Sequence, residues 1–492
     1  MKLLLPYALT FSASIVSSCL SLICAPVFAE AEIAQVVQSD QDVFSDVHDF
    51  IWFDQQGPKP LTLDMLALAQ DLGFWQSKGL SPNTASVQIS RELDDGYSQL
   101  FIEMLKTIRP EQDIDEPIGV EQLRQAAQAH HLHNLLDSML PEHRQVQLLR
   151  EQIRRYQQLE KYVWPTISST NYRLGQRSPE IAKLRWMLTQ FGDLPAKPSN
   201  TYREAIYDPG IVSAIKHFQL RHGLPESGEL DSLTRKALQI PPSQKIVHLR
   251  KALLRWFALP IQLPERYLWV NIPAYQLQVM ENNNSVLSMR VIVGKPETPT
   301  PQMATTLNLV TLNPTWTPPS SIIYGELLPK NGRNPGYLAA HGFELRKVTQ
   351  GNSLAVPLAN QSSKQIATQL SEFQLVQQPG ADNALGRYRF SILNNEAIYL
   401  HDTPVKSLFR RPNRALSHGC VRLEKADILV NYLLTRHINQ SPAAIKDALA
   451  QKSPRYLKLT EPLPVLMTYL TAWVDARGVV QFRPDIYKLD YP

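Results

Sequence analysis

One cysteine stands among histidines in a pattern that could support nucleophilic catalysis. The run Ser417-His418-Gly419-Cys420 lies on an expected loop, and His401 precedes it with fifteen residues between them. A thiol attacks an amide or ester carbonyl well only as its thiolate, so it needs a base or an imidazolium close by. Two histidines near one cysteine could supply this, and the glycine lets another part of the backbone approach closely. The pattern predicts that Cys420 is a nucleophile.

The first 29 residues have the features of an export signal. Lys2 is followed by an apolar run from Leu3 to Ala25, and small residues at 27–29 suit a cleavage site. We therefore expect a signal peptide over 1–29 and export to the periplasm. Two alternatives stay open from the same residues: a retained membrane anchor, and a lipoprotein modified at Cys19.

The positions of the other two cysteines make Cys420 more informative. Cys19 and Cys24 both lie within the expected signal, so the exported chain keeps one thiol in a compartment that oxidises thiols. Without an intramolecular partner, this thiol forms no structural disulfide. It is a reactive group or an inert buried one, and the neighbouring histidines favour the first.

Length and composition indicate a globular chain of two or three domains. Of its 492 residues, 43% are hydrophobic and 19% are charged, which argues against wholesale disorder. The formal net charge is +5, and it falls by one to +4 if Lys2 leaves with the signal. No lysine- or arginine-rich run is present, so we expect no nucleic-acid partner.

The first half of the chain is predicted to be helical. Residues 35–165 carry apolar residues at helical spacing, most clearly at 61–72 and 143–162. We expect a helical scaffold domain there. A linking helix is expected over 241–264.

Residues 172–240 are predicted to form a small three-helix unit. Its helices are expected at 179–191, 209–222 and 231–238, after the capping residues Ser178, Asp208 and Asp231. The unit resembles the small peptidoglycan-binding domain, which implies glycan strands as a ligand. The residues that carry this resemblance are Val212, Ala214, Ile215, Phe218, Gln219, His222, Gly223, Leu224, Gly228, Asp231 and Thr234–Leu238.

After Pro264 the apolar period changes from 3.6 to 2, which is typical of strands. Strands are expected at 266–271, 275–280, 286–293, 307–313, 387–393 and 396–400, and a helix at 424–435. A mixed segment, 320–372, is predicted to be an inserted lid. The predicted fold class is therefore α+β and multidomain, with a β-rich catalytic domain over 265–460. Residues 461–492 form an expected C-terminal extension that contains a hairpin.

The region around Cys420 resembles the L,D-transpeptidase family, with its YkuD-type catalytic domain. The family motif is a histidine, a spacer like the one found here, and then Ser/Thr-His-Gly-Cys. The order of helical region, peptidoglycan-binding unit and transpeptidase is similar to the large, multidomain YcbB-like branch of Gram-negative bacteria. Further segments that carry the resemblance are NIPAYQLQV (271–279), MRVIVGKPETPTP (289–301), NPTWTPPSSI (313–322), QQPGADNALGRYRF (377–390) and SHGCVRL (417–423).

This resemblance implies roles for the motif residues. Cys420 would be the nucleophile and His401 the general base and acid, with its tautomer held by the backbone carbonyl of Asp402. A Cys-His-Asp triad through the Asp402 side chain is the alternative. The residues expected to support the active site are Ser417, His418 and Gly419, and backbone N–H groups of Gly419 and Cys420 would form an oxyanion hole. The expected substrate contacts are Asn383, Tyr399 and Arg422, the last of which stands where the family motif often has asparagine.

The implied reaction is acyl transfer in peptidoglycan. The thiolate would attack the carbonyl of diaminopimelate in a tetrapeptide stem and expel the terminal D-alanine, and an amine on a neighbouring stem would complete a 3–3 cross-link. The implied partners are tetrapeptide stems and glycan strands, with room for other cell-wall synthesis proteins, and no metal or cofactor is implied. A carboxypeptidase and a lipoprotein-attaching transpeptidase are the alternatives, because the sequence does not reveal the acceptor.

Other interpretations of the same residues stay open. His401, His418 and Cys420 could supply three zinc ligands, with His341 or water as a fourth, although no Cys-x-x-Cys or His-Glu-x-x-His spacing is present. Ser417 could be a serine nucleophile, although no Gly-x-Ser-x-Gly turn surrounds it. A wall-bound scaffold without catalysis is the third alternative, and the intact pair of His401 and Cys420 argues against it.

Overall fold

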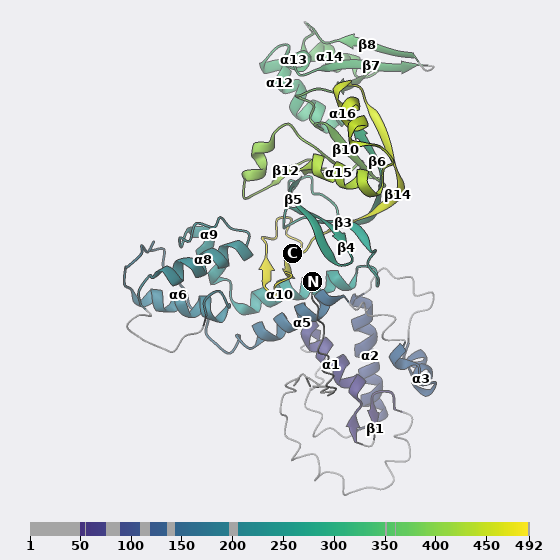
Figure 1. The fold of residues 1–492 in the computed structure, drawn as a ribbon. Coiled ribbons are helices and arrows are strands. Elements are labelled where there is room, and N and C mark those ends of the chain that lie inside the picture. The colour runs from purple at the N-terminus through teal and green to yellow at the C-terminus, as the bar shows by residue number, and fades with distance from the viewer. Residues whose placement is uncertain are drawn as a thin grey trace, which may run out of the picture.

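Helices and strands both contribute to the fold, so the α+β class is confirmed. The computed structural model describes residues 50–54, 56–74, 89–108, 119–134, 143–195, 205–349, 352–359 and 361–490. The expected signal, 1–29, lies outside these residues. Figure 1 shows the catalytic sheet between a helical region and a further small unit at the opposite end of the molecule. Among the described helices, none combines the length and the apolar character that a membrane crossing requires.

The described N-terminal half is helical, as its apolar spacing predicts. Its elements are a ribbon of β1 (Phe53–Asp54) and β2 (Gly57–Pro58), then α1 (Pro60–Leu72), α2 (Arg91–Ile108), α3 (Val120–Gln128), α5 (Arg144–Gln157), α6 (Pro179–Gln190), α8 (Pro209–Arg221), α9 (Ser232–Gln239) and α10 (Pro242–Phe257). Ser178, Asp208 and Asp231 each accept a backbone N–H in the first turn of α6, α8 and α9. These three helix starts are therefore fixed by the capping residues that the sequence indicates.

One buried core joins these helices to the end of the chain. Apolar side chains from α1 to α10 cluster with those of a C-terminal hairpin, β15 (Ala472–Val474) and β16 (Val480–Phe482). The ring of Phe482 lies 5.9 Å from that of Tyr156 on α5. The Gln145 side chain donates to the carbonyl of Val474 at 2.5 Å and accepts its N–H at 3.1 Å. The C-terminal extension therefore leaves the catalytic region and packs against the helices.

The catalytic region is built on a nine-stranded sheet. Its order is β12-β5-β13-β11-β10-β6-β14-β3-β4, and β4 also pairs with β5, so the sheet closes on itself. The strands are β3 (Arg266–Asn271), β4 (Gln276–Glu281), β5 (Asn284–Gly294), β6 (Met303–Leu312), β10 (Tyr388–Ile392), β11 (Tyr399–His401), β12 (Ala415–Ser417), β13 (Val421–Leu423) and β14 (Arg455–Thr468). Helices α15 (Ala426–Arg436) and α16 (Pro442–Ala450) add apolar side chains to the core of this sheet, and a short 3-10 helix, η6 (Lys406–Arg410), precedes β12. Because β14 pairs with β3 and β6 as far as Met467, the expected boundary after residue 460 falls inside a strand of the sheet.

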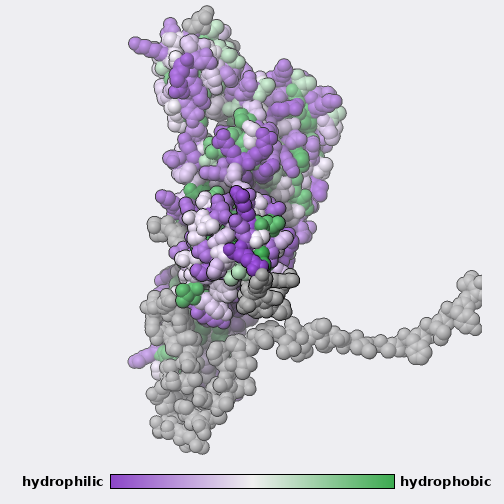
Figure 2. Space-filling model, turned by 90° about the vertical axis from the view of Figure 1, so that its left-hand side faces the viewer, coloured by the Kyte–Doolittle hydropathy of each residue, from purple (hydrophilic) through white to green (hydrophobic). Residues whose placement is uncertain are grey.

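A separate small unit is inserted between β6 and β10. Its elements are α11 (Ser320–Ile322), η5 (Ile323–Leu327), α12 (Leu328–Arg333), α13 (Tyr337–Ala340), β7 (Phe343–Thr349), β8 (Asn352–Pro357), α14 (Ser363–Gln369) and β9 (Gln374–Gln377). It has its own apolar cluster around the fully buried Leu338, Leu345 and Ile366. The strand β9 pairs with β7, so the unit extends beyond residue 372, where the sequence analysis placed its end. Figure 2 shows that hydrophilic residues dominate the visible face of this unit.

Candidate active site

Two adjacent strands carry the motif residues. Strand β11 pairs in parallel with β13, with Leu400 opposite Val421. Both of these side chains are fully buried in the core of the sheet, and successive side chains of a strand point to opposite faces. The residues on the face turned away from this core are therefore Tyr399 and His401 on β11, Arg422 on β13, and Cys420 immediately before β13. We call this the catalytic face.

His401 is buried, and a backbone carbonyl holds its ring. Its side chain is 5% exposed, and its Nδ1 lies 2.6 Å from the carbonyl oxygen of Asp402. Because Nδ1 donates to that carbonyl, Nε2 is left as an acceptor, which is the tautomer a general base needs. Burial, followed by the positive charge of Arg422, lowers the pKa of His401 to about 3. The imidazole is therefore neutral at physiological pH.

The carboxylate of Asp402 is engaged by other residues. It accepts the backbone N–H of Arg387 at 3.0 Å and pairs with the ammonium of Lys406 at 2.5 Å. Gly386, at φ +60°, packs so closely that a Cβ there would collide with this carboxylate. The geometry therefore gives no support to a Cys-His-Asp triad, and the carbonyl of Asp402 orients the imidazole.

The thiol of Cys420 interacts with the start of β11. Its Sγ donates to the carbonyl of Ala397 at 3.8 Å. Burial raises the pKa of the Cys420 thiol, while hydrogen bonds from the backbone and the hydroxyl of Tyr399 act in the opposite direction. No hydrogen bond joins Sγ to His401, both of which the structure describes. The pair is thus a neutral thiol and a neutral imidazole, and proton transfer between them must await a bound substrate.

The loop that carries Cys420 is braced by short hydrogen bonds. Ser417 Oγ donates to the carbonyl of Cys420 at 2.6 Å and accepts the N–H of Gly419 at 3.2 Å. Gly419 has φ +113°, a conformation that L side chains rarely adopt. Because its N–H is already used by Ser417, it is not free to serve the expected oxyanion hole in this state.

Sequence analysis missed two residues that hold this loop. Thr300 Oγ1 donates to the carbonyl of Gly419 at 2.6 Å and also accepts the N–H of Gly294 at 2.8 Å. Tyr487, in the C-terminal extension, donates to the carbonyl of Gly294 at 2.6 Å and accepts the N–H of Thr300 at 3.1 Å. Thr300 lies in a segment that carries the family resemblance, but no pattern in the sequence connects Tyr487 with the motif.

His418 reaches the inserted unit. Its Nε2 lies 3.0 Å from a carboxylate oxygen of Glu326 on η5. Burial lowers the pKa of His418, and the charge of Glu326 acts against that shift. This hydrogen bond is a direct contact between the insertion and the catalytic loop.

Asn383 is a bracing residue and not the substrate contact that the sequence analysis expected. Its side chain is 1% exposed, and its amide donates to the carbonyls of Pro314 and Gln378, both at 3.0 Å. Its Oδ1 accepts the N–H of Leu385 at 2.8 Å. With these bonds made, the amide has little left to offer a ligand.

Tyr399 and Arg422 lie on the catalytic face together with an arginine that the sequence analysis missed, Arg389. Arg389 stands opposite His401 in the antiparallel pair β10–β11, and its guanidinium carbon lies 4.6 Å from the centre of the Tyr399 ring. A signal for it did exist: 388, 390 and 392 are apolar and buried in alternation, so Arg389 must face the other way.

The structure does not assemble the zinc site considered above. In the described part of the chain, no three side chains of His, Cys, Asp or Glu gather as metal ligands do. His401 uses Nδ1 on a carbonyl and His418 faces Glu326. His341 lies on the insertion with its Nδ1 2.8 Å from the carbonyl of Tyr337.

Comparisons with known proteins agree with this chemistry. Residues 265–438 match the family described as "L,D-transpeptidase catalytic domain", and residues 177–238 match the family "Putative peptidoglycan binding domain". Residues 265–438 are therefore similar to L,D-transpeptidase catalytic domains. A curated protein of Haemophilus influenzae, named "Putative L,D-transpeptidase", is 34% identical over 286 residues, which are 57% of this chain and 57% of that protein. The chain thus spans little more than half the length of this relative.

Solved structures of L,D-transpeptidases align only loosely. An L,D-transpeptidase from Mycobacterium smegmatis shares 15% identity over 42% of this chain and 58% of its own, with a TM-score of 0.19. One from Stackebrandtia nassauensis shares 13% identity over 62% of this chain and 97% of its own, with a TM-score of 0.21. At TM-scores this low, the alignments add nothing to the family matches.

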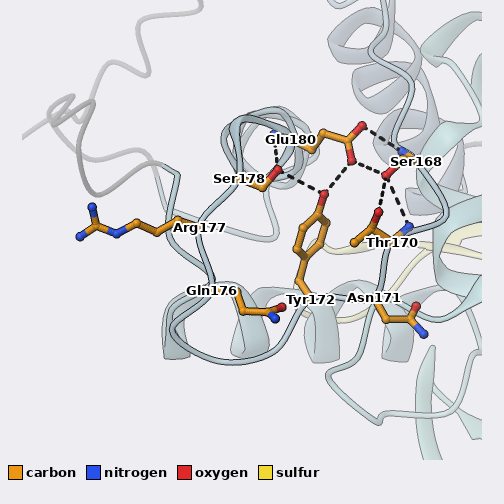
Figure 3. A pocket seen from close by; sticks show the side chains of 8 residues that line it. All are labelled: Ser168, Thr170, Asn171, Tyr172, Gln176, Arg177, Ser178 and Glu180. Carbon is orange, nitrogen blue, oxygen red and sulfur yellow. Dashed lines mark hydrogen bonds between the residues drawn. The ribbon is translucent and has the colours of Figure 1, made fainter.

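A polar cleft of about 570 Å³ lies at the start of the region that matches the peptidoglycan-binding family. It is lined by Ser168, Thr170, Asn171, Tyr172, Gln176, Arg177, Ser178 and Glu180. In Figure 3 the hydroxyls of Tyr172 and Ser168 point to the Glu180 carboxylate, whereas the Arg177 side chain points away from them. Hydrogen bonds from Ser168 and Tyr172 lower the pKa of Glu180. Because these groups already satisfy one another, the cleft offers a ligand few free polar groups.

Proposed function

We propose that this protein is an L,D-transpeptidase of peptidoglycan that uses Cys420 as nucleophile and His401 as general base and acid. The observation that carries the proposal is the placement of both residues on one face of adjacent strands, with His401 Nδ1 fixed on the Asp402 carbonyl. The family match over residues 265–438 supports the same chemistry. The bond that is cleaved, between diaminopimelate and the terminal D-alanine of a tetrapeptide stem, is the one that the family resemblance implies.

In the first half-reaction the thiol of Cys420 attacks the carbonyl carbon of diaminopimelate in a tetrapeptide stem. His401 Nε2 takes the thiol proton as the C–S bond forms. When the amide C–N bond breaks, the imidazolium returns this proton to the nitrogen of the departing D-alanine. A thioester between the stem and Cys420 remains.

In the second half-reaction an amine of a neighbouring stem attacks the thioester. His401 takes a proton from the attacking nitrogen and returns it to the sulfur as the C–S bond breaks. The product is a 3–3 cross-link, and the enzyme regains its thiol. Water in place of the amine would give a carboxypeptidase, so the site must disfavour water.

The insertion is a candidate lid for this purpose. The contact of Glu326 with His418 supports this role, because it joins the insertion to the catalytic loop. Lids of this kind exclude water and commit the bound substrate. The region over residues 177–238 would hold the enzyme on the glycan strands, and export to the periplasm would bring it to the wall, where it would meet other cell-wall synthesis proteins.

The deciding experiment incubates the exported form, and a Cys420→Ala variant, with disaccharide tetrapeptides and identifies the products by mass spectrometry. We expect loss of D-alanine and a 3–3 linked dimer from the wild type, and neither from the variant. D-alanine release without a dimer, even at high acceptor concentration, would favour the carboxypeptidase. The same products from Cys420→Ala would refute the thiol mechanism.

A further inference from the structure

Two arginines flank His401 on the catalytic face. His401 stands opposite Arg422 in the parallel pair β11–β13 and opposite Arg389 in the antiparallel pair β10–β11. All three side chains point away from the core of the sheet, because their neighbours Val421, Leu400 and Phe390 are buried in it. The two arginine Cα atoms lie about two strand spacings apart, roughly 10 Å, which two long side chains can bridge.

Neither guanidinium has a protein carboxylate to neutralise it. The Nε–H groups of Arg389 and Arg422 are buried and donate to no acceptor, and neither residue forms an ion pair with any of the described side chains. The carboxylate whose charge acts on Arg422 is that of Glu326, which is paired with His418. Both arginines are half-buried, and a partly desolvated cation without a counter-ion is costly, so an anion that binds there would relieve that cost.

We propose that Arg389 and Arg422 form a carboxylate-binding subsite. In the first half-reaction it binds the carboxylate of the leaving D-alanine, and in the second it binds the carboxylate next to the attacking amine of the acceptor. The proposal rests on the function proposed above and assigns its acceptor class. Guanidinium is well suited to this task, since its planar N–H groups match the geometry of a carboxylate.

The chemistry of the two half-reactions explains why one subsite serves both. The leaving D-alanine carries its carboxylate on the carbon next to the scissile nitrogen. The amine at the D-centre of diaminopimelate, which attacks in a 3–3 cross-link, also carries a carboxylate on the adjacent carbon, and so does any free D-amino acid. The ε-amine of a lysine side chain has no such neighbour. The subsite therefore selects an amine whose adjacent carbon carries a carboxylate, as the D-centre of diaminopimelate and free D-amino acids do, and disfavours a lipoprotein lysine.

A carboxylate bound in the subsite also raises the proton affinity of His401. The charges of Arg422 and Arg389 both contribute to the low pKa of His401. A carboxylate bound between them offsets these charges, so the imidazole accepts the thiol proton more readily when the correct substrate is in place. Recognition and activation are then coupled through the same two arginines.

The test compares paired substrates with the exported full chain. Thioester formation on Cys420 is followed by mass spectrometry with a tetrapeptide ending in D-alanine and with the same peptide ending in D-alaninamide. Transfer from the thioester is followed with D-methionine, D-methioninamide and an Nα-blocked lysine amide as acceptors. We expect the free acids to react faster than the amides by roughly ten- to a hundredfold, the size of a hydrogen bond to a charged group. The blocked lysine should react no better than the amide.

Variants assign this preference to the arginines. Arg389→Gln should lose most of the acid-to-amide ratio, and Arg389→Lys should keep part of it because the charge remains. Arg387→Gln is the matched control, because it removes an exposed arginine from the same segment and should leave the ratio unchanged. Thermal melting of each variant shows that it is folded.

Each result decides a different point. Equal rates for acids and amides in the wild type overturn the subsite while leaving the transpeptidase in place. A full acid preference in Arg389→Gln also overturns it, since the preference then arises elsewhere. If the wild type forms no thioester with any peptide, the proposed function fails and the subsite fails with it.

Discussion

Among the helices of residues 177–238 and on the catalytic face, the molecule desolvates arginine side chains in two contrasting ways. In the first cluster, Arg221 is 2% exposed and donates to the Asp193 carboxylate at 2.5 and 2.6 Å, and His217 lies 2.7 Å from the same carboxylate. In the second, Arg389 and Arg422 have buried Nε atoms without a partner. One cluster contains its own counter-charge and the other does not.

This contrast indicates that the first cluster stabilises the fold and the second binds a ligand. A buried guanidinium that is held by a carboxylate fixes the packing of the helices around it, and removing one partner leaves the other charge stranded. A buried guanidinium without a carboxylate gives little stability and keeps its hydrogen bonds for a ligand. Perturbed titration alone would not distinguish the clusters, because burial also lowers the pKa of Lys245 and His222 in the first.

The largest expected effect concerns stability. Asp193→Ala strands Arg221 in the core of the helical region, and we expect it to lower the free energy of unfolding by about 3–5 kcal/mol. Arg389→Gln removes a half-buried cation that has no carboxylate partner, and we expect a change in the free energy of unfolding within about 1 kcal/mol. Urea unfolding of both variants measures this.

The two variants should rank in the reverse order for activity, with Arg389→Gln more strongly affected than Asp193→Ala. Below its melting temperature, Asp193→Ala should acylate Cys420 with tetrapeptide at the wild-type rate, whereas Arg389→Gln should be slowed. If Arg389→Gln proved as destabilising as Asp193→Ala, the catalytic arginine would be a structural element and the contrast between the clusters would be lost.

The next effect is a shift of two pKa values, those of Cys420 and His401, in the same direction. An unpaired cation near a thiol favours the thiolate, and near an imidazole it disfavours the imidazolium. Arg422→Gln should therefore raise the pKa of both Cys420 and His401. We expect iodoacetamide to label wild-type Cys420 with a rate that rises above neutral pH, and the midpoint should move higher in Arg422→Gln.

Two controls make this titration decisive. Arg387→Gln should shift neither group, because its side chain is exposed. His401→Ala and the wild type should both label slowly at neutral pH, since the thiol and imidazole are neutral before substrate binds. A wild-type midpoint below neutrality would mean a preformed thiolate–imidazolium pair and would contradict the geometry described here.

Local elements were readable from the sequence, whereas contacts across the fold were not. The capped helices at Ser178, Asp208 and Asp231 and the strand at 266–271 follow from residue type and apolar period. The placement of Arg389 beside His401 depends on the register of β10 against β11, which a single sequence does not supply.

Long-range bracing was harder still. Gln145 reaches Val474 because the C-terminal hairpin packs on the helices, and Tyr487 reaches Gly294 because the chain then returns to the catalytic sheet. Asn383 shows the opposite error: a polar residue near the motif was expected to bind substrate, but tertiary packing buries it among carbonyl groups.

The smallest effect concerns Glu326, the carboxylate whose charge acts on Arg422. It pairs with His418 at 3.0 Å, and it is 39% exposed. Exposed ion pairs contribute about 0.2–1 kcal/mol, so Glu326→Gln should change the partition of the thioester between water and amine by only a few-fold, in favour of hydrolysis. The ratio of hydrolysed to transferred product, read by mass spectrometry, measures the change. Glu372→Gln is the matched control, since it removes another carboxylate of the insertion that pairs with an exposed Lys347.

The pH dependence of that ratio identifies what Glu326 contributes. Burial lowers the pKa of His418, so the contact is an ion pair only at acidic pH and a neutral hydrogen bond above it. Glu326→Gln, which can still hydrogen-bond, should therefore differ from the wild type most at acidic pH, whereas Glu326→Ala should differ at every pH. Neither variant should alter the preference for free acids over amides, because Glu326 pairs with His418 and leaves the arginines free. A Glu326→Gln enzyme with altered acid preference would mean that the catalytic cations do have a protein counter-ion.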